Sequence, residues 1–148
     1  MTLSAQEMSD RFEIQDLLYH YADLIDHKDF DGLRGVFTAD AHIDYSAFGG
    51  SVGDLETTIE FLHGVMGMFP ATQHLNANIQ IRIDGDSGTG QVMCFNPQEL
   101  RIDDDHTQVF MLGLWYVDEY RRTPEGWRIA RRHEEKSWVF NTPDFMNL

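Results

Sequence analysis

The decapeptide HLNANIQIRI, residues 74–83, alternates strictly between polar and apolar side chains. A period of two is typical of a β-strand with one buried face, because successive side chains of a strand point to opposite sides. The pattern therefore predicts a strand whose buried face carries Leu75, Ala77, Ile79, Ile81 and Ile83. His74 opens this strand on the opposite, polar face, and the turn sequence DGDSG follows the strand.

Three further strand-like runs follow, at about residues 88–101, 107–122 and 127–139. The polar segments DDDH and TPEG separate them, and turn-linked strands of this length are most simply an antiparallel meander. In the second of these runs, apolar and aromatic residues occupy adjacent positions between Phe110 and Tyr116. Both faces of the sheet then need cover, and the lining of a pocket would supply part of it.

The first part of the chain predicts helices. Apolar residues within residues 5–27 recur at the i, i+3, i+4 and i+7 spacing of an amphipathic helix, at Ile14, Leu17, Leu18, Tyr21 and Ile25. A short second helix is expected over residues 29–37, with Asp29 as its N-cap. The two helices would form a pair that covers one face of the sheet.

A short strand and a third helix are expected before the meander. In AHIDY, residues 41–45, apolar and polar residues alternate, and Tyr45 falls on the apolar side. Asp54 is placed to cap a helix that ends before Pro70. The order of elements predicts one α+β domain over residues 1–148, in which the N-terminal helices pack on a curved, mixed and mostly antiparallel sheet.

Composition narrows the function classes. The chain has 11 lysine and arginine residues against 25 aspartate and glutamate residues, a formal net charge of −14. Such a charge repels nucleic acid and anionic membrane surfaces, so neither is an expected partner. No basic leader or long apolar segment is present, and Cys94 is the single cysteine. We expect a cytoplasmic protein without a disulfide.

Two histidine-containing clusters are better explained as surface features. His20, Asp23 and His27 have a spacing that could present metal ligands on the opening helix, but they lie opposite its apolar stripe. A solvated polar face is the favoured interpretation, so no metal site is predicted. His133, Glu134 and Glu135 lie in the charged run RIARRHEEKSW, which predicts a salt-linked surface strand.

A third candidate is the pair His74 and Asp26. Asp26 ends the opening helix at the border of its apolar stripe, in line with Tyr19, where the chain turns into the next helix. His74 begins the clearest strand. Spacing alone gives this pair little weight, because an isolated histidine in a strand is more often structural than catalytic.

A resemblance gives the pair more weight. The segments YADLIDHKDFDGLRGVFTADAHIDY (residues 21–45), TQH (residues 72–74) and YRRTPEGW (residues 120–127) resemble the nuclear-transport-factor-2-like superfamily. Within it, the SnoaL-like group that contains scytalone dehydratase is most similar. The resemblance covers most of the chain through the order and spacing of short motifs. It implies a cone-shaped α+β barrel that encloses a pocket.

The resemblance also implies roles for individual residues. Asp26 would orient His74 as a general base, as in the aspartate–histidine dyads of scytalone dehydratase and hexachlorocyclohexane dehydrochlorinase. Tyr45 matches a tyrosine that helps hold a water against the substrate carbonyl. Tyr19 is included among the expected substrate-binding residues.

The chain departs from the scytalone dehydratase pattern at several pocket positions. Gln98 stands where that family has a second histidine, and Tyr116 where it has a substrate-binding asparagine. Ile25 replaces a pocket tyrosine, and Leu114 replaces a serine. Because these changes remove polar groups that recognise a hydroxylated naphthalenone, the pocket should prefer a more apolar molecule.

Two classes of function follow. The first is a cofactor-independent lyase or isomerase of the dehydratase type, acting on a polyketide-, steroid- or aromatic-derived carbonyl compound. The second is a non-catalytic ligand carrier or an accessory subunit resembling the small subunit of ring-hydroxylating oxygenases. A homo-oligomer, dimer or trimer, formed through the convex face of the sheet is expected in either case, because that face commonly serves as an oligomer surface in the superfamily.

Overall fold

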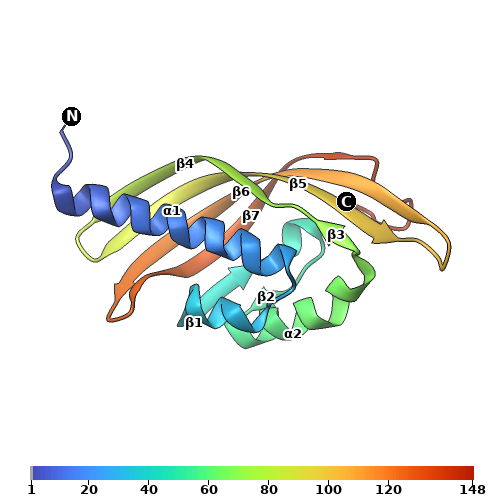
Figure 1. Ribbon diagram of the computed structural model, residues 1–148, viewed down its shortest axis with the longest axis horizontal. Coiled ribbons are helices and arrows are strands. Elements are labelled where there is room, and N and C mark those ends of the chain that lie inside the picture. The colour runs from blue at the N-terminus through green and yellow to red at the C-terminus, as the bar shows by residue number, and fades with distance from the viewer. Residues whose placement is uncertain (1) are drawn as a thin grey trace.

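The computed structural model describes residues 2–148 (Figure 1). Its helices are α1 (Ala5–Asp26) and α2 (Leu55–Val65), with the short 3₁₀ helices η1 (Asp31–Gly35), η2 (Ser46–Phe48) and η3 (Met66–Met68). Its strands are β1 (Phe37–Asp44), β2 (Val52–Gly53), β3 (Ala71–Thr72), β4 (Leu75–Asp84), β5 (Ser87–Arg101), β6 (Thr107–Thr123) and β7 (Gly126–Phe140). In Figure 1, α1 runs along the sheet, and β1, β2 and α2 gather beside its C-terminal part.

The strands form one seven-stranded sheet in the order β2-β1-β7-β6-β5-β3, with β4 also paired to β5. The pairs β4–β5, β5–β6 and β6–β7 are antiparallel, as the turn-linked runs predict. Strand β1 pairs with β7 in parallel, which makes the sheet mixed. The predicted α+β fold, with helices against a curved and mostly antiparallel sheet, is confirmed.

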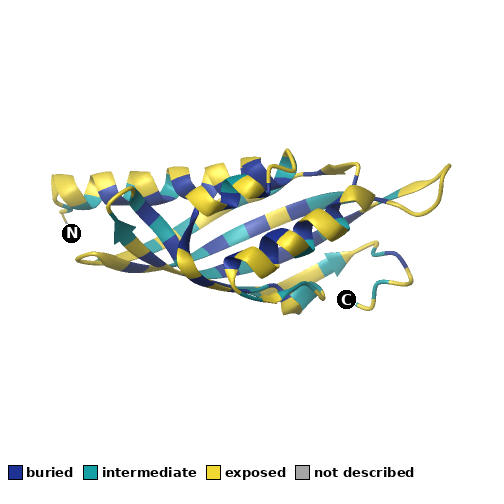
Figure 2. Ribbon diagram, turned by 90° about the horizontal axis from the view of Figure 1, so that it is seen from below, coloured by how far each residue is buried: buried dark blue, intermediate teal, exposed yellow. Residues whose placement is uncertain are grey.

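Helix α1 begins where the Ser4 side chain accepts a hydrogen bond from the backbone N–H of Glu7. It buries the predicted stripe, and Ile14 and Leu18 are fully inaccessible to solvent. Figure 2 shows buried residues on the surfaces of helix and sheet that face each other. The apolar core therefore lies between α1 and the inner face of the sheet.

The N-terminal half of α1 is tied to the β6–β7 hairpin by a charged cluster. Asp10, only 4% exposed, accepts two hydrogen bonds of 2.8 Å from the Arg122 guanidinium and one of 3.1 Å from Trp127 Nε1. The hydrogen bond from Arg122 is the main cause that lowers the pKa of Asp10 to about 2, against the opposing effect of burial. This cluster fixes the direction of α1 across the sheet.

The predicted second helix forms only the 3₁₀ turn η1. Two glycines within five residues disfavour a longer helix. At Gly32, an added Cβ would lie 2.6 Å from Leu24 Cδ2, so the turn packs tightly against α1. Asp29 accepts a hydrogen bond from the Gly32 N–H, which is close to its predicted capping role. The predicted third helix is present as α2, and Asp54 caps it by accepting from the Thr57 N–H.

Strand β4 differs from its prediction at Asn78. The β4–β5 register shifts between Ala77 and Gln80, and Asn78 has a φ of 46°. This β-bulge reverses the alternation, so that Leu75 is 50% exposed while the inner face receives Ile79, Ile81 and Ile83. The sequence pattern placed His74 on the face opposite these isoleucines. The bulge instead brings His74 to the same inner side of the sheet.

Within residues 2–148, no helix has the length and apolar character needed to cross a membrane.

Candidate acid–base site

The predicted pair is in direct contact at the C-terminal end of α1. His74 Nδ1 lies 2.7 Å from Asp26 Oδ1, and the backbone N–H of His74 donates to Asp26 Oδ2 at 2.9 Å. Thr72 adds a third hydrogen bond, from its hydroxyl to Oδ1 at 2.9 Å. Because Asp26 is the last residue of α1 and His74 immediately precedes β4, the joint between helix and sheet sets this geometry.

Asp26 is the anionic member of the pair. Burial acts to raise the pKa of this carboxyl, but the hydrogen bonds from His74 and Thr72 outweigh burial and leave the pKa below its usual value. A carboxylate facing Nδ1 holds the proton of a neutral imidazole on that nitrogen. The lone pair of His74 is then on Nε2.

Asn96 of β5 completes the surroundings of His74. Its amide nitrogen lies 3.1 Å from His74 Nε2, so it donates a hydrogen bond to the lone pair there. Its Oδ1 is buried and has no hydrogen-bond partner among residues 2–148. An unpaired acceptor beside the imidazole is a place where a polar group of a ligand can donate.

His74 lies in the wall of a cavity of about 150 Å³ between the sheet and the helices. Aromatic and aliphatic side chains make up most of the lining, including Phe48, Phe61, Leu62, Phe69, Phe110 and Leu112. Polar atoms come from few residues, among them His74, Asn96 and Gln98. An apolar cavity with a few polar groups is typical of a small-molecule site.

Two tyrosine hydroxyls form a pair in this cavity. The Tyr21 and Tyr45 oxygens are 2.6 Å apart, and burial raises the pKa of both groups. The guanidinium of Arg132 lies over the rings of Tyr21 and Tyr116, at 4.3 Å and 4.0 Å from their centroids. Tyr21 and Tyr45 therefore remain neutral hydrogen-bond donors beside the buried Arg132 cation.

Arg132 is itself fully buried and paired. Its Nε and one terminal nitrogen donate to Asp118 at 2.8 Å and 2.7 Å, a bidentate ion pair with both side chains at 0% exposure. The remaining nitrogen, Nη1, has no hydrogen-bond partner among residues 2–148. The Arg132–Asp118 ion pair thus lies behind the Tyr21 and Tyr116 rings that line the cavity.

The position of the Glu134 side chain corrects one prediction made from the sequence. The segment around it was predicted to be a salt-linked surface strand, but the side chain of Glu134 lines the cavity. The register of β6 against β7 shifts at two places, between Glu119 and Tyr120 and between Gly113 and Leu114. Between the two bulges the even-numbered residues of β7 face inward, which places Arg132 and Glu134 inside. Alternation within RIARRHEEKSW does not reveal the bulges.

Most of the predicted site residues line the cavity or contact a residue that does, and one does not. The cavity lining includes His74, Tyr45, Ile25, Gln98 and Tyr116, and Asp26 lies behind His74. Tyr19 does not belong to the lining and is 50% exposed, so its predicted place in the site is wrong. Tyr19 is about 200° around the helix from the buried Tyr21, which explains its exposure.

Four residues of the site were missed as site residues by the sequence analysis: Tyr21, Asn96, Arg132 and Glu134. Tyr21 was recognised only as part of the apolar stripe. Asn96 shares the inward parity of Gln98 on β5, so strand alternation could have found it. Arg132 and Glu134 follow a bulge and carry no comparable signal.

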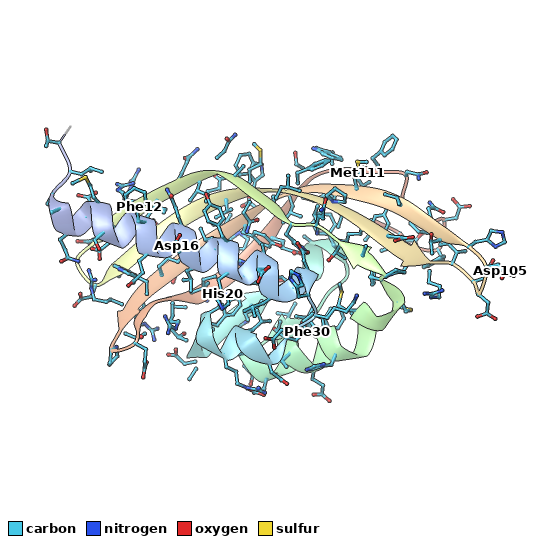
Figure 3. All side chains as sticks on the ribbon, in the orientation of Figure 1. Phe12, Asp16, His20, Phe30, Asp105 and Met111 are labelled. Atoms are coloured by element: carbon cyan, nitrogen blue, oxygen red, sulfur yellow. The ribbon has the colours of Figure 1, made fainter. Side chains whose placement is uncertain are left out.

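The other histidine clusters lie at the surface. His20, labelled on α1 in Figure 3, is exposed, as are Asp23 and His27. In the described part of the chain, no group of three or more histidine, cysteine or acidic side chains could hold a metal ion. A larger open depression of about 500 Å³, lined by Arg82, Glu119 and Arg131 among others, includes none of the predicted site residues.

A curved sheet covered by helices, with a carboxylate–imidazole pair in the wall of an apolar cavity, defines the class as an α+β pocket protein. The model of the SnoaL-like domain matches residues 6–133. The chain therefore belongs to the SnoaL-like family of the nuclear-transport-factor-2-like superfamily, which includes dehydratases and isomerases.

Three known proteins illustrate what the chain is similar to in sequence or in structure. An uncharacterized protein of Mycobacterium tuberculosis is 48% identical over 134 residues, 90% of each chain. A candidate scytalone dehydratase from Novosphingobium aromaticivorans has a TM-score of 0.83 at 17% identity, over 95% of this chain and 93% of that one. A hexachlorocyclohexane dehydrochlorinase from Novosphingobium barchaimii has a TM-score of 0.77 at 17% identity, over 96% of each chain. The likeness to these two structures is one of fold.

Proposed function

We propose that the protein is a cofactor-independent lyase or isomerase that removes a proton next to a carbonyl group of a small, largely apolar molecule. The observation that carries the proposal is the 2.7 Å contact between His74 Nδ1 and Asp26 in the wall of the cavity. A carboxylate that fixes the tautomer leaves the second ring nitrogen as the proton acceptor, which makes an imidazole a competent base. His74 Nε2 is the atom that would accept the proton.

The tyrosine pair supports the same chemistry. Removal of a proton next to a carbonyl places negative charge on the carbonyl oxygen. One hydroxyl of the Tyr21–Tyr45 pair donates to the other, so the second can donate a hydrogen bond to that oxygen, and the Arg132 guanidinium beneath the Tyr21 ring favours the charge. Base and donor would then act on neighbouring atoms of one substrate.

The size and lining of the cavity limit the substrate. A volume of about 150 Å³ is below the usual range for drug-sized ligands, so a single ring or a short branched chain is favoured. Aromatic walls favour an apolar body, and Gln98 and Asn96 offer polar contacts at one side. The names of two proteins of similar fold, a dehydratase and a dehydrochlorinase, both denote eliminations.

The test uses cyclohexanone and β-hydroxycyclohexanone dissolved in deuterium oxide. NMR measures how fast deuterium replaces the α-protons of these ketones. The wild-type protein should accelerate exchange, and His74→Ala should slow it by about 10²–10⁴-fold, the usual contribution of a general base. His20→Ala, a change at an exposed histidine of α1, is the matched control and should exchange at the wild-type rate.

If the wild-type protein exchanged α-protons no faster than the His74→Ala variant, the proposed function would be wrong. If the ketones still bound under those conditions, a ligand carrier would become the better description.

A further inference from the structure

We propose that Glu134 is a second catalytic residue of this site, which donates a proton to the departing oxygen of the substrate while His74 removes a proton from the neighbouring carbon. The inference rests on the proposed function and deepens it, because it specifies the leaving group. A site with a dedicated proton donor suits an alcohol that loses water.

Glu134 shares the cavity with the base but lies on a different wall. It is paired in register with Tyr116 across β6 and β7, and both side chains line the cavity. The Tyr116 ring packs edge-on against Tyr21 at 5.7 Å, and Tyr21 packs against the His74 ring at 6.5 Å. Glu134 of β7 and His74 at the start of β4 therefore border the same cavity.

The Glu134 carboxyl has no hydrogen-bond or ion-pair partner among residues 2–148. Arg132 acts on Glu134 electrostatically, but two nitrogens of that guanidinium already donate to Asp118. A carboxyl group that serves the fold is normally paired when it is removed from water. An unpaired carboxyl in the lining of a cavity is instead available to a ligand.

The surroundings favour the protonated form of Glu134. Desolvation is the main cause that raises the pKa of its carboxyl to about 8, Arg132 opposes the shift, and the Asp44 carboxylate adds to it. The other titratable groups that line the same cavity are Tyr21, Tyr45, Tyr116 and His74. Burial raises the pKa of all three tyrosines, so they remain neutral and add no charge near Glu134.

The proposed step balances with these two groups alone. His74 Nε2 takes the proton from the α-carbon, and the electron pair of that C–H bond forms the C=C bond. The C–O bond at the β-carbon breaks with its electron pair on oxygen, which receives the Glu134 proton and leaves as water. The site then holds an imidazolium and a Glu134 carboxylate, and one proton passes from the first to the second through water to restore it.

The test compares two leaving groups on one skeleton. β-Hydroxycyclohexanone needs a proton on its departing oxygen, whereas β-chlorocyclohexanone releases chloride without one. Glu134→Gln should lower the ratio of the rate of water loss to the rate of chloride loss by about 10²-fold or more, because only the departing hydroxyl needs the Glu134 proton. Glu135→Gln, a change at the adjacent exposed carboxyl, is the matched control and should leave this ratio unchanged.

The pH dependence of water loss separates a proton donor from a residue that only supports the structure, because a structural role of Glu134 would not change this dependence. Water loss by the wild type should fall as the pH rises through about 8, where Glu134 loses its proton. The Glu134→Gln protein should lack this alkaline fall. In the free protein, the Glu134 carbon resonance, assigned by its absence in Glu134→Gln, should titrate well above the normal range of a glutamate.

The outcomes separate the two proposals. An unchanged ratio of water loss to chloride loss in Glu134→Gln would overturn the role of Glu134. A Glu134 carboxyl that titrates near the ordinary pKa of a glutamate would also overturn this role. So would a wild-type protein that exchanges α-protons but releases neither water nor chloride. Absence of α-proton exchange in the wild type would instead overturn the proposed function itself.

Discussion

At the scale of single residues, the site depends on the carboxylate that holds the imidazole. Asp26 accepts from both the ring and the backbone of His74, so it fixes the tautomer and the position of the base together. Two residues that act as one unit give non-additive losses when both are changed. Asp26 lies behind His74 and is not part of the cavity lining, so its proposed role is to position the imidazole.

A double-mutant cycle follows from this arrangement. Asp26→Asn should slow α-proton exchange by about 10²-fold or more, because an amide cannot hold the imidazole as the carboxylate does. The double variant with His74→Ala should be no slower than His74→Ala alone, measured by NMR on cyclohexanone. Fully additive losses would mean that the two residues act independently.

At the scale of elements, the bulge at Asn78 decides which way His74 faces. Asparagine tolerates the left-handed conformation, with a φ of 46° here, better than most residues other than glycine. A β-branched residue is strained there. The bulge at Asn78 thus sets the orientation of His74, four residues earlier in the chain, at the N-terminal end of β4.

The backbone conformation of Asn78 can be tested by substitution. Asn78→Val should lower the free energy of unfolding by about 1–2 kcal/mol, the cost of the left-handed region for an ordinary side chain. Asn78→Gly should retain most of the stability, because glycine adopts this conformation without strain. Urea denaturation of the three proteins gives the comparison, and a valine variant as stable as the wild type would argue against a strained bulge.

The sequence predicted α1, α2 and the meander because their signals are local. The stripe on α1, the Asp54 cap and the turns before β6 and β7 each follow from residues close in sequence. Bulges depend on how two strands pair, so the buried face of β4 was assigned incorrectly at Leu75 and the segment around Glu134 was predicted to lie at the surface. Asp26 and His74 were found through a resemblance, whereas Glu134 was hidden by the bulge in β7.

At the scale of the whole molecule, the outer face of the sheet carries an exposed apolar row. Leu75, Phe95, Gly113 and Trp138 are register partners across β4, β5, β6 and β7. The three side chains are 38–50% exposed, and Phe140 beside them is 61% exposed. At Gly113 an added Cβ would collide with the Trp138 ring, so the glycine lets the indole lie on the sheet. Contiguous exposed apolar surface of this kind marks an interaction site.

We propose that this row joins copies of the chain into a dimer or trimer. Multi-angle light scattering should give a mass of two or three chains for the wild type. Trp138→Asp should shift the mass towards one chain, because a charge in an apolar interface is not compensated. Phe12→Asp, a change at an aromatic residue of α1 that is 67% exposed, is the control and should leave the mass unchanged. A monomeric wild type would refute the proposal.

The C-terminal segment after β7 has a practical consequence. Met146 and Leu148 are part of the cavity lining, whereas the first turn of α1 lies at the far end of the helix from Asp26 (Figure 1). A purification tag fused behind Leu148 would start at the cavity and could obstruct it, while a tag placed before α1 would stay clear. The same position suits an environment-sensitive dye, whose emission would report the arrival of a molecule in the cavity before any reaction is known.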